Sequence, residues 1–390
     1  MMFFCFPLIS SEASATTTRT PGINEPGDGN VFLGVQGTYE NVSVEDVLTR
    51  INELRLEAYN EGFVSEYIPI KWSKELEYMA QIRAAEASVL ESHSRPRGSS
   101  ALYMNVNGVT AYAENLDWGV NALQSIEDWY TEKPEYEINP DSAKAGHYKT
   151  LIARYCRYVG FGSFARLGKH RSVSALFTDA TGTPTEEKYN ASGDYIQLIE
   201  VPESKISLSV SGPDSVAVGK TGSYTLNAVY NNRDLIVPSA VWQSSTAKAG
   251  VSAAGKLTGK AVGNTTVTGK PAFNGKTGSI EASKDVTITI GANPMTVTGK
   301  TAIVKYTAVK KKAQTLKRYK VLTVKNNKGT TTYTKKTGNR KILVNRTTGK
   351  VTVKKGIKRG LYKVTVSIRA AGNANYKALT KKATFRIRVK

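Results

Sequence analysis

The sequence predicts a multi-domain protein in which an α+β domain precedes two all-β sandwich modules. Its 390 residues exceed what a single hydrophobic core usually organises. Apolar residues recur at helical spacing only before residue 153, and short β-branched and aromatic runs follow. From residue 293 onward the charge composition changes abruptly, which indicates a further module.

Two of the three predicted helices have clear ends. The first begins at Ser43, whose hydroxyl can cap it, and ends near Gly62. Another covers residues 123–132, with Leu123 among the residues expected to face inward. Pro134 is expected to close that helix, because the residue before a proline disfavours helical geometry.

The helix between these two leads to the chemistry of the chain. It is predicted to begin at Ser73 and to stop before His93, where a proline and a glycine follow. Its apolar stripe predicts one buried face. Its charged side chains are expected mostly to face solvent: Lys74, Glu77 and Arg83.

Strands are predicted after a short helical segment at residues 148–152. Helices followed by antiparallel strands indicate an α+β layered domain over residues 43–202. Residues 16–42, rich in Thr, Gly, Pro and Asn, are expected to form a flexible leader. The predicted strands of this domain are 158–164, 172–177 and 195–201.

Two β-modules are predicted next, at residues 204–291 and 293–390. Helical periodicity is absent from residue 205 onward, and short strands alternate with Gly, Asn and Pro turns, which is typical of sandwiches. Residues 251–258 parallel residues 344–352, which favours a tandem pair.

The N-terminus predicts export from the cell. Residues 1–15 resemble a signal peptide, with an apolar start and a small-residue cleavage site at Ala13-Ser14-Ala15. No other segment has the length and apolarity of a transmembrane helix. After cleavage Cys156 would be the one remaining cysteine, and its apolar neighbours predict a buried small residue and not a nucleophile.

The basic residues are concentrated in the last module. Residues 293–390 carry 28 of the 54 Lys and Arg residues and none of the 32 acidic ones. A merely soluble surface mixes both signs, so this asymmetry predicts a polyanionic partner. Nucleic acid is disfavoured, because the chain is expected to be exported and has no recognition motif. The expected partners of this module are anionic cell-wall polymers or acidic glycans.

Two histidines and two carboxylates lie within one stretch of a chain that has three histidines. They are His93, Glu114, Glu132 and His147. The carboxylates could orient the imidazoles and raise their basicity for acid–base catalysis. Alternatively, the set could bind a divalent metal, zinc or calcium, and leave a position open for water. These four residues are therefore both the catalytic and the metal-ligand candidates.

The first domain resembles the CAP superfamily, which includes cysteine-rich secretory proteins, antigen 5 and pathogenesis-related 1. The resemblance rests on the order and spacing of several motifs. The motifs are Asn52-Glu-Leu-Arg55, Trp72-Ser-Lys-Glu-Leu76, His93-Ser-Arg-Pro-Arg-Gly98, Ala113-Glu-Asn-Leu116, Trp129-Tyr-Thr-Glu132, Gly146-His-Tyr148 and Val159-Gly-Phe-Gly162. The chain lacks the disulfides of plant and animal members, as in the bacterial branch.

The resemblance implies a three-layer α–β–α sandwich whose cavity is lined by the two histidines and two glutamates. Family members are linked variously to divalent metals, to sterol or lipid ligands and to disputed proteolysis. Residues 205–290 resemble a bacterial Ig-like domain of group 2 (BIG2), through Val241-Trp-Gln-Ser-Ser245 and Gly255-Lys-Leu-Thr-Gly259. The basic module is similar to Lys-rich β repeats of secreted Gram-positive proteins, so two Ig-like sandwiches are expected.

Together these observations predict a secreted, cell-surface or wall-associated CAP-domain protein. Its cavity would bind a divalent metal, a small ligand or a lipid, its Ig-like domain would act as a spacer, and its cationic tail would hold it at the envelope. One alternative is a secreted metal-dependent hydrolase or peptidase that uses the same His/Glu cluster. A second alternative is an adhesion protein in which the CAP domain serves as a scaffold.

Overall fold

The structure is a computed structural model that describes residues 17–22, 25–167, 170–189 and 191–390. The predicted signal peptide at residues 1–15 lies outside the described residues. The chain forms two compact units. The first contains the segments up to Ser209, Leu226–Val241 and Gly269–Ala282, and the second contains Val210–Thr225, Trp242–Thr268 and Ser283–Lys390.

The first unit contains the predicted helices. Ser43 and Ser73 cap α1 and α2, accepting hydrogen bonds from the backbone N–H groups of Asp46 and Leu76, both at 3.3 Å. A short helix, α4, begins immediately after α3, with Pro134 in its first turn, so the proline starts a helix as well as separating two. The helices are α1 (Val44–Asn60), α2 (Lys74–Ala87), α3 (Ala122–Tyr130), α4 (Lys133–Ile138) and α5 (Gly146–Ile152).

One sheet forms the middle of this unit. Its strands run in the order β9-β2-β7-β8-β6, and all four of these pairings are antiparallel. The central strands confirm the predicted ones. Bounds are β1 (Thr17–Arg19), β2 (Asn30–Tyr39), β3 (Lys71–Trp72), β4 (Asn105–Val106), β5 (Val109–Thr110), β6 (Ala113–Trp118), β7 (Tyr158–Arg166), β8 (His170–Thr178), β9 (Gly193–Pro202), β13 (Thr225–Tyr230), β14 (Arg233–Ile236) and β19 (Lys276–Thr277).

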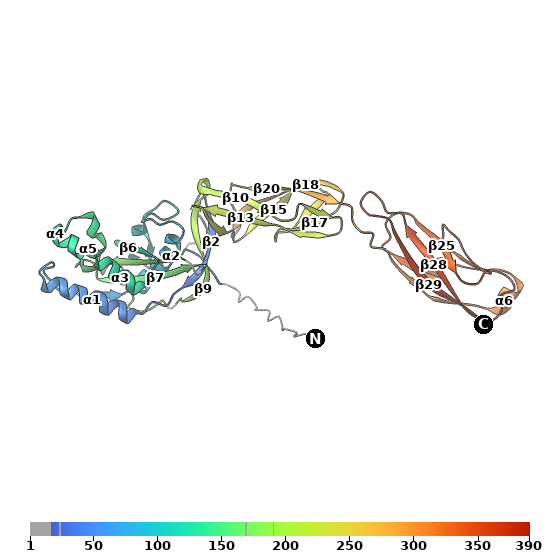
Figure 1. Ribbon diagram of the computed structural model, residues 1–390, viewed down its shortest axis with the longest axis horizontal. Coiled ribbons are helices and arrows are strands. Elements are labelled where there is room, and N and C mark those ends of the chain that lie inside the picture. The colour runs from blue at the N-terminus through green and yellow to red at the C-terminus, as the bar shows by residue number, and fades with distance from the viewer. Residues whose placement is uncertain (1–16, 23–24, 168–169, 190) are drawn as a thin grey trace, which may run out of the picture. The chain divides into compact units, whose positions relative to one another are not determined.

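Helices cover both faces of the sheet, which makes three layers (Figure 1). Val159 and Phe161 of β7 pack in a core with residues of α1, α3 and α5. The alternating residues Gly160 and Gly162 face α2. A Cβ atom at Gly160 would lie 2.1 Å from the backbone nitrogen of Glu77, so only glycine lets α2 approach this closely. The predicted three-layer α–β–α arrangement is confirmed.

Three predictions for this unit are wrong. Residues 30–39, placed in a flexible leader, form β2, which lies between β7 and β9 and is mostly buried. The charged residues Glu77 and Arg83 do not face solvent but are 2% and 0% exposed, because α2 is covered by the sheet on one side and by residues 101–111 on the other. Leu123, expected inside, is 39% exposed.

The second unit is almost entirely strands. Its residues 293–390 build a sandwich: the sheet β22-β29-β28-β25 packs against β23-β27-β26 around one apolar core. The other strands within or entering this unit are β10 (Ile206–Ser211), β11 (Ser215–Ala217), β12 (Thr221–Ser223), β15 (Ala240–Ser244), β16 (Ala249–Val251), β17 (Lys256–Gly259), β18 (Gly263–Phe273) and β20 (Ala282–Thr289).

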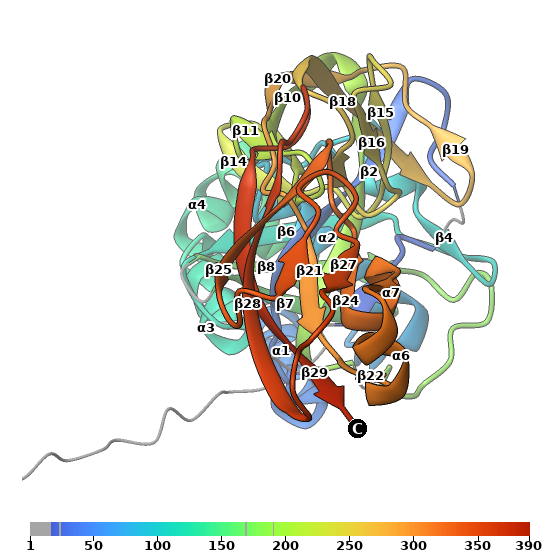
Figure 2. The same ribbon diagram turned by 90° about the vertical axis from the view of Figure 1, so that its right-hand side faces the viewer.

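The basic segment also contains helix, which the sequence reading did not predict. Two short helices, α6 (Tyr306–Lys311) and α7 (Arg318–Val321), precede strands of the sandwich, and Figure 2 shows both. Val309 and Val321 are fully buried and tie them to the core. The strands are β21 (Thr296–Gly299), β22 (Thr301–Val304), β23 (Gln314–Leu316), β24 (Leu322–Lys325), β25 (Thr331–Thr337), β26 (Ile342–Val344), β27 (Val351–Val353), β28 (Gly360–Ala370) and β29 (Leu379–Val389).

Cys156 is fully buried and unpaired, as predicted. Burial raises the pKa of its thiol to about 12, so the thiolate does not form at neutral pH. Among the described residues, no helix has both the length and the apolarity needed to cross a membrane.

Candidate functional site

Four separate elements bring the predicted site residues together. His93 lies in the loop after α2, and Glu114 is the second residue of β6. Glu132 stands between α3 and α4, and His147 is in the first turn of α5. The centroids of the two imidazole rings are 6.3 Å apart. All four candidates therefore belong to one site.

Each imidazole is held by one carboxylate. His93 Nδ1 lies 2.9 Å from Glu114 Oε2, and His147 Nδ1 lies 2.6 Å from Glu132 Oε1. A neutral imidazole whose Nδ1–H donates to a carboxylate has its lone pair on Nε2. The same arrangement therefore leaves the two Nε2 atoms as the groups available for a proton, a substrate or a metal.

Glu132 is fixed by the start of α5. Its Oε2 atom accepts hydrogen bonds from the backbone N–H groups of His147 at 2.8 Å and Tyr148 at 3.1 Å. Burial opposes ionisation of this carboxyl, but the hydrogen bonds from the His147 ring and from the two amides outweigh burial and lower the pKa of Glu132. Glu132 is therefore a carboxylate at neutral pH.

A network of buried charged side chains holds Glu114 in place. Its Oε1 atom lies 2.8 Å from Arg83 Nε, and the Arg83 guanidinium also lies 3.7 Å from Glu86. Glu86 in turn pairs with Arg95 at 2.7 Å. Arg83 and Glu86 have fully buried side chains, and Arg83 also donates to the carbonyl oxygen of Ser92, next to His93. Arg83 thus holds both the carboxylate and the loop that carries the imidazole.

Sequence reasoning missed Arg83 and Glu86. Arg83 was expected on the solvent side of α2, because only one apolar face was assigned to the helix, and Glu86 was not considered. The signal that could have found them is their spacing: an Arg and a Glu three residues apart on an otherwise Ala-rich helix can pair with each other. A buried pair of this kind commonly supports a functional site.

The second histidine has two further supports. The Trp129 ring stacks near the His147 ring, with centroids 6.0 Å apart and planes inclined by 28°. The Trp129 indole N–H donates to Leu116 O at 3.2 Å, and Asn115 Nδ2 donates to His147 O at 3.0 Å. Residues of the motifs Glu114-Asn-Leu116 and Trp129-Tyr-Thr-Glu132 therefore both help to position His147.

The site is open on its imidazole side. The His93 and His147 side chains are 64% and 33% exposed, whereas the Glu114 and Glu132 side chains are 4% and 21% exposed. The carboxylates are thus the more buried members of the site, and the imidazoles are the more exposed ones. This arrangement can accept or donate protons at the ring nitrogens, or bind a ligand there.

The four residues do not form a ready-made metal cage. Within the described ranges, no group of three or more His, Cys, Asp and Glu side chains is arranged to hold an ion. Glu114 and Glu132 already bind imidazole, Arg83 or backbone amides, so direct coordination by them would break those contacts. If a metal bound here, the two Nε2 atoms would be its available ligands, and the carboxylates would be the outer partners that metal-bound histidines usually have.

Residues 48–176 match the family model named CAP, cysteine-rich secretory protein family. This segment is therefore similar to a CAP domain. The match runs from within α1 to within β8 and includes all four site residues. No curated protein matches the chain.

The solved structures with detectable similarity include two cadherins and an S-layer protein. Human protocadherin-24 EC1-2 is 9% identical, with 46% of this chain and 97% of that chain covered and a TM-score of 0.22. Drosophila N-cadherin EC1-4 is 9% identical, with coverage of 61% and 59% and a TM-score of 0.20. Domains 4 and 5 of the S-layer protein SbsC are 17% identical, with coverage of 47% and 98% and a TM-score of 0.18. TM-scores this low relate neither fold nor function.

Proposed function

We propose that the CAP domain binds a divalent transition metal, with zinc as the best candidate, through His93 and His147. The observation that carries this proposal is that both Nδ1 atoms are held by carboxylates, at 2.9 and 2.6 Å, while the rings lie 6.3 Å apart. Nitrogen ligands favour zinc over calcium, because calcium takes oxygen ligands. Glu114 and Glu132 orient the rings and make them better ligands.

A bound metal of this kind would polarise a ligand or a water molecule at its open positions. The residues of the chain do the rest. Glu132, itself held by two amides, keeps the His147 ring in one tautomer, and Arg83 does the same for His93 through Glu114. Because neither carboxylate needs to move, the ring nitrogens are already oriented before any ligand arrives.

The test is zinc titration by calorimetry with the full chain, in parallel with calcium. We expect one zinc site, and His93→Ala or His147→Ala should weaken it at least tenfold. His170→Ala is the matched control, because this third histidine is exposed at the start of β8 and belongs to no site described above. Equal zinc affinity in all three variants, or tighter binding of calcium than of zinc, contradicts the proposal.

A hydrolase that uses the same cluster is the second candidate. The 2.6 Å contact between His147 and Glu132 supports it, because a carboxylate-oriented imidazole can act as a general base at Nε2. Peptide and ester libraries should then be cleaved by the parent protein and not by His147→Ala. If the parent protein binds zinc but cleaves none of these substrates, the domain is a binding module.

We further propose that the chain is secreted and that residues 293–390 retain it at an anionic envelope. The support is chemical: 28 cations and no acid occupy this segment, and strand alternation leaves many of them exposed. Residues 204–291 would serve as an Ig-like, BIG2-type spacer. Binding of the chain to purified cell walls should fall steeply as salt rises. If walls bind the chain equally at all salt concentrations, retention is not electrostatic.

The adhesion alternative makes the opposite prediction for the CAP site. If the CAP domain is only a scaffold, the parent protein does not bind zinc. Glu114→Ala and His147→Ala then bind cell walls as well as the parent does. Zinc binding in the parent that is lost in His147→Ala excludes this reading.

A further inference from the structure

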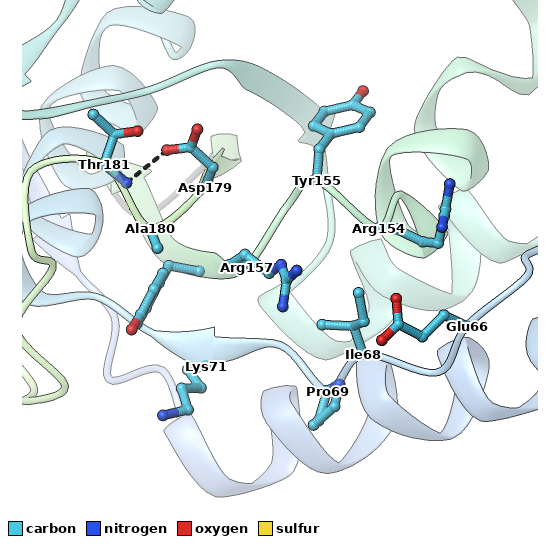
Figure 3. A pocket seen from close by; sticks show the side chains of 11 residues that line it. Glu66, Ile68, Pro69, Lys71, Arg154, Tyr155, Arg157, Asp179, Ala180 and Thr181 are labelled. Carbon is cyan, nitrogen blue, oxygen red and sulfur yellow. Dashed lines mark hydrogen bonds between the residues drawn. The ribbon is translucent and has the colours of Figure 1, made fainter.

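A second surface feature of the CAP domain lies away from the His/Glu site. It is a groove of about 860 Å³ between the loop that follows α1, the α5–β7 loop and the loop after β8 (Figure 3). It includes none of the four site residues. Its volume is within the range of about 300–1,000 Å³ that small-ligand sites usually have.

The backbone around the groove is firmly held. Lys71 N–H donates to Arg157 O at 3.0 Å, and Arg157 N–H donates to Thr178 O at 2.7 Å. Arg55, which is 2% exposed, donates from Nε to Leu151 O at 2.8 Å and from Nη1 to Ile68 O at 3.1 Å. The groove is therefore built by the ends of β3, β7 and β8 and by a buried side chain, and its loops are held by contacts within the protein.

Arg55 places a positive charge beside the groove. It forms no ion pair with a carboxylate of the described residues, and its Nη2 atom has no hydrogen-bond partner among them. Burial lowers the pKa of Arg55 to about 10, so the guanidinium remains charged at neutral pH. A buried cation that contacts only backbone carbonyls creates a field that favours an anion in the adjacent space.

Two more guanidinium groups lie on the groove itself. Arg154 and Arg157 are exposed, and neither forms a side-chain hydrogen bond or an ion pair within the described part of the chain. The lysine that lines the groove is paired, because Lys71 Nζ lies 2.7 Å from Glu186 Oε1. The fork of a guanidinium matches a carboxylate or a phosphate.

The groove also contains carboxylate hydrogen-bond acceptors, which restrict the class of ligand that can bind. Figure 3 shows Glu66 and Arg154 towards one end and Asp179 towards the other, with Arg157 between them. One oxygen of Asp179 is used by Thr181 N–H at 2.7 Å, and the rest of this acceptor capacity is open to a ligand. A bare anion such as phosphate would be repelled by these carboxylates. In a ligand that carries both an acid and hydroxyl groups, the acid can pair with the arginines and the hydroxyl groups can donate hydrogen bonds to the carboxylates.

The lining also offers apolar surface. Tyr155 is 60% exposed. Ile68 and Pro69 line the groove from the loop that follows α1. A ring with an apolar face can pack on such a surface while its edge groups make hydrogen bonds. We propose that this groove binds a uronic-acid oligosaccharide, with its carboxylates on Arg154 and Arg157 and its hydroxyls on Glu66 and Asp179.

The test follows backbone amide resonances of the full chain by transverse-relaxation-optimised NMR during titration with trigalacturonic acid. We expect the amides of residues 154–158 and 179–181 to shift, and maltotriose, a neutral trisaccharide, to shift them much less. Reading the groove amides separates this site from the cationic segment 293–390. Shifts confined to residues 293–390, or equal shifts with maltotriose, overturn the proposal.

Variants give the second arm of the test. Arg157→Ala and Arg154→Ala should each weaken binding at the groove by roughly tenfold or more, because charge-assisted hydrogen bonds are lost. Arg157→Lys should recover part of the affinity. Lys144→Ala is the matched control, because it removes one exposed cation outside the groove. Inorganic phosphate that binds as tightly as the trisaccharide, or an unchanged affinity in both arginine variants, also overturns the proposal.

Discussion

At the scale of single residues, the His147–Glu132 pair links the site to pH. The pKa of Glu132 is lowered in the folded protein, so its contribution to stability is full above its ordinary pKa of 4.5 and is lost as pH falls through the lower folded value. We expect Glu132→Gln to lower the free energy of unfolding at pH 7 by about 1–2 kcal/mol, because bonds to a charged acceptor are lost.

The same variant should lose less stability between pH 5 and pH 3 than the parent does. Urea unfolding at several pH values measures both effects. Glu45→Gln is the control, because Glu45 is exposed in the first turn of α1 and makes no side-chain contact described above. Parallel pH profiles for the parent and Glu132→Gln would show that the carboxylate is not stabilised as the geometry indicates.

Arg83 provides a second prediction at this scale. Arg83→Met should destabilise the protein by about 3–5 kcal/mol, because it leaves Glu114 and Glu86 buried without their shared cation. Arg50→Met removes a half-exposed pair with Glu127 and should cost less than about 1 kcal/mol. Chemical denaturation gives the free energy of unfolding of each variant, and the two values can be compared directly because both replace Arg by Met. Similar losses in the two variants would mean that the Arg83 network contributes no more than a surface pair.

At the scale of elements, the approach of α2 to the sheet depends on two glycines of β7. A Cβ atom at Gly160 would lie 2.1 Å from Glu77 N, and one at Gly162 would lie 2.3 Å from Ala80 O. Gly160→Ala should therefore cost about 2–4 kcal/mol, because backbone and not a flexible side chain must move. Gly146→Ala is the control: its Cβ meets nothing within 4 Å, and its φ is −63°. Thermal unfolding that is equal in the two variants would contradict this packing argument.

Elements with local signals were predictable, and those that depend on packing were not. Ser43 and Ser73 mark the starts of α1 and α2 because capping is a local interaction. β2 was missed because Gly34 and Gly37 made it resemble a leader. Their role is tertiary: a Cβ at either position would lie 2.5 Å from a side-chain atom, of Ile196 or of Phe164. Likewise, the convergence of the four site residues followed from the family motifs, whereas the Arg83 network required the three-dimensional packing of α2.

At the scale of the whole molecule, composition predicted a cationic module but not where its charges lie. Strand pairing places Arg386 between Thr301 and Lys363, and Arg388 between Ile303 and Leu361. These side chains alternate with buried residues, so they share the outer face of the sheet β22-β29-β28-β25. The charge count alone cannot separate attraction by net charge from docking on this face.

Charge removal at two places makes that distinction. Changing Lys363, Arg386 and Arg388 to Gln removes three charges from the outer sheet face, while changing Lys354, Lys355 and Lys358 removes three exposed charges from the β27–β28 connection. Both variants have the same net charge. If the face docks on an anionic wall polymer, the first variant should lose roughly tenfold in affinity for purified cell walls and the second about twofold, because clustered charges act together at short range. Equal losses in sedimentation assays at fixed salt would mean that the module responds to net charge alone and has no docking face.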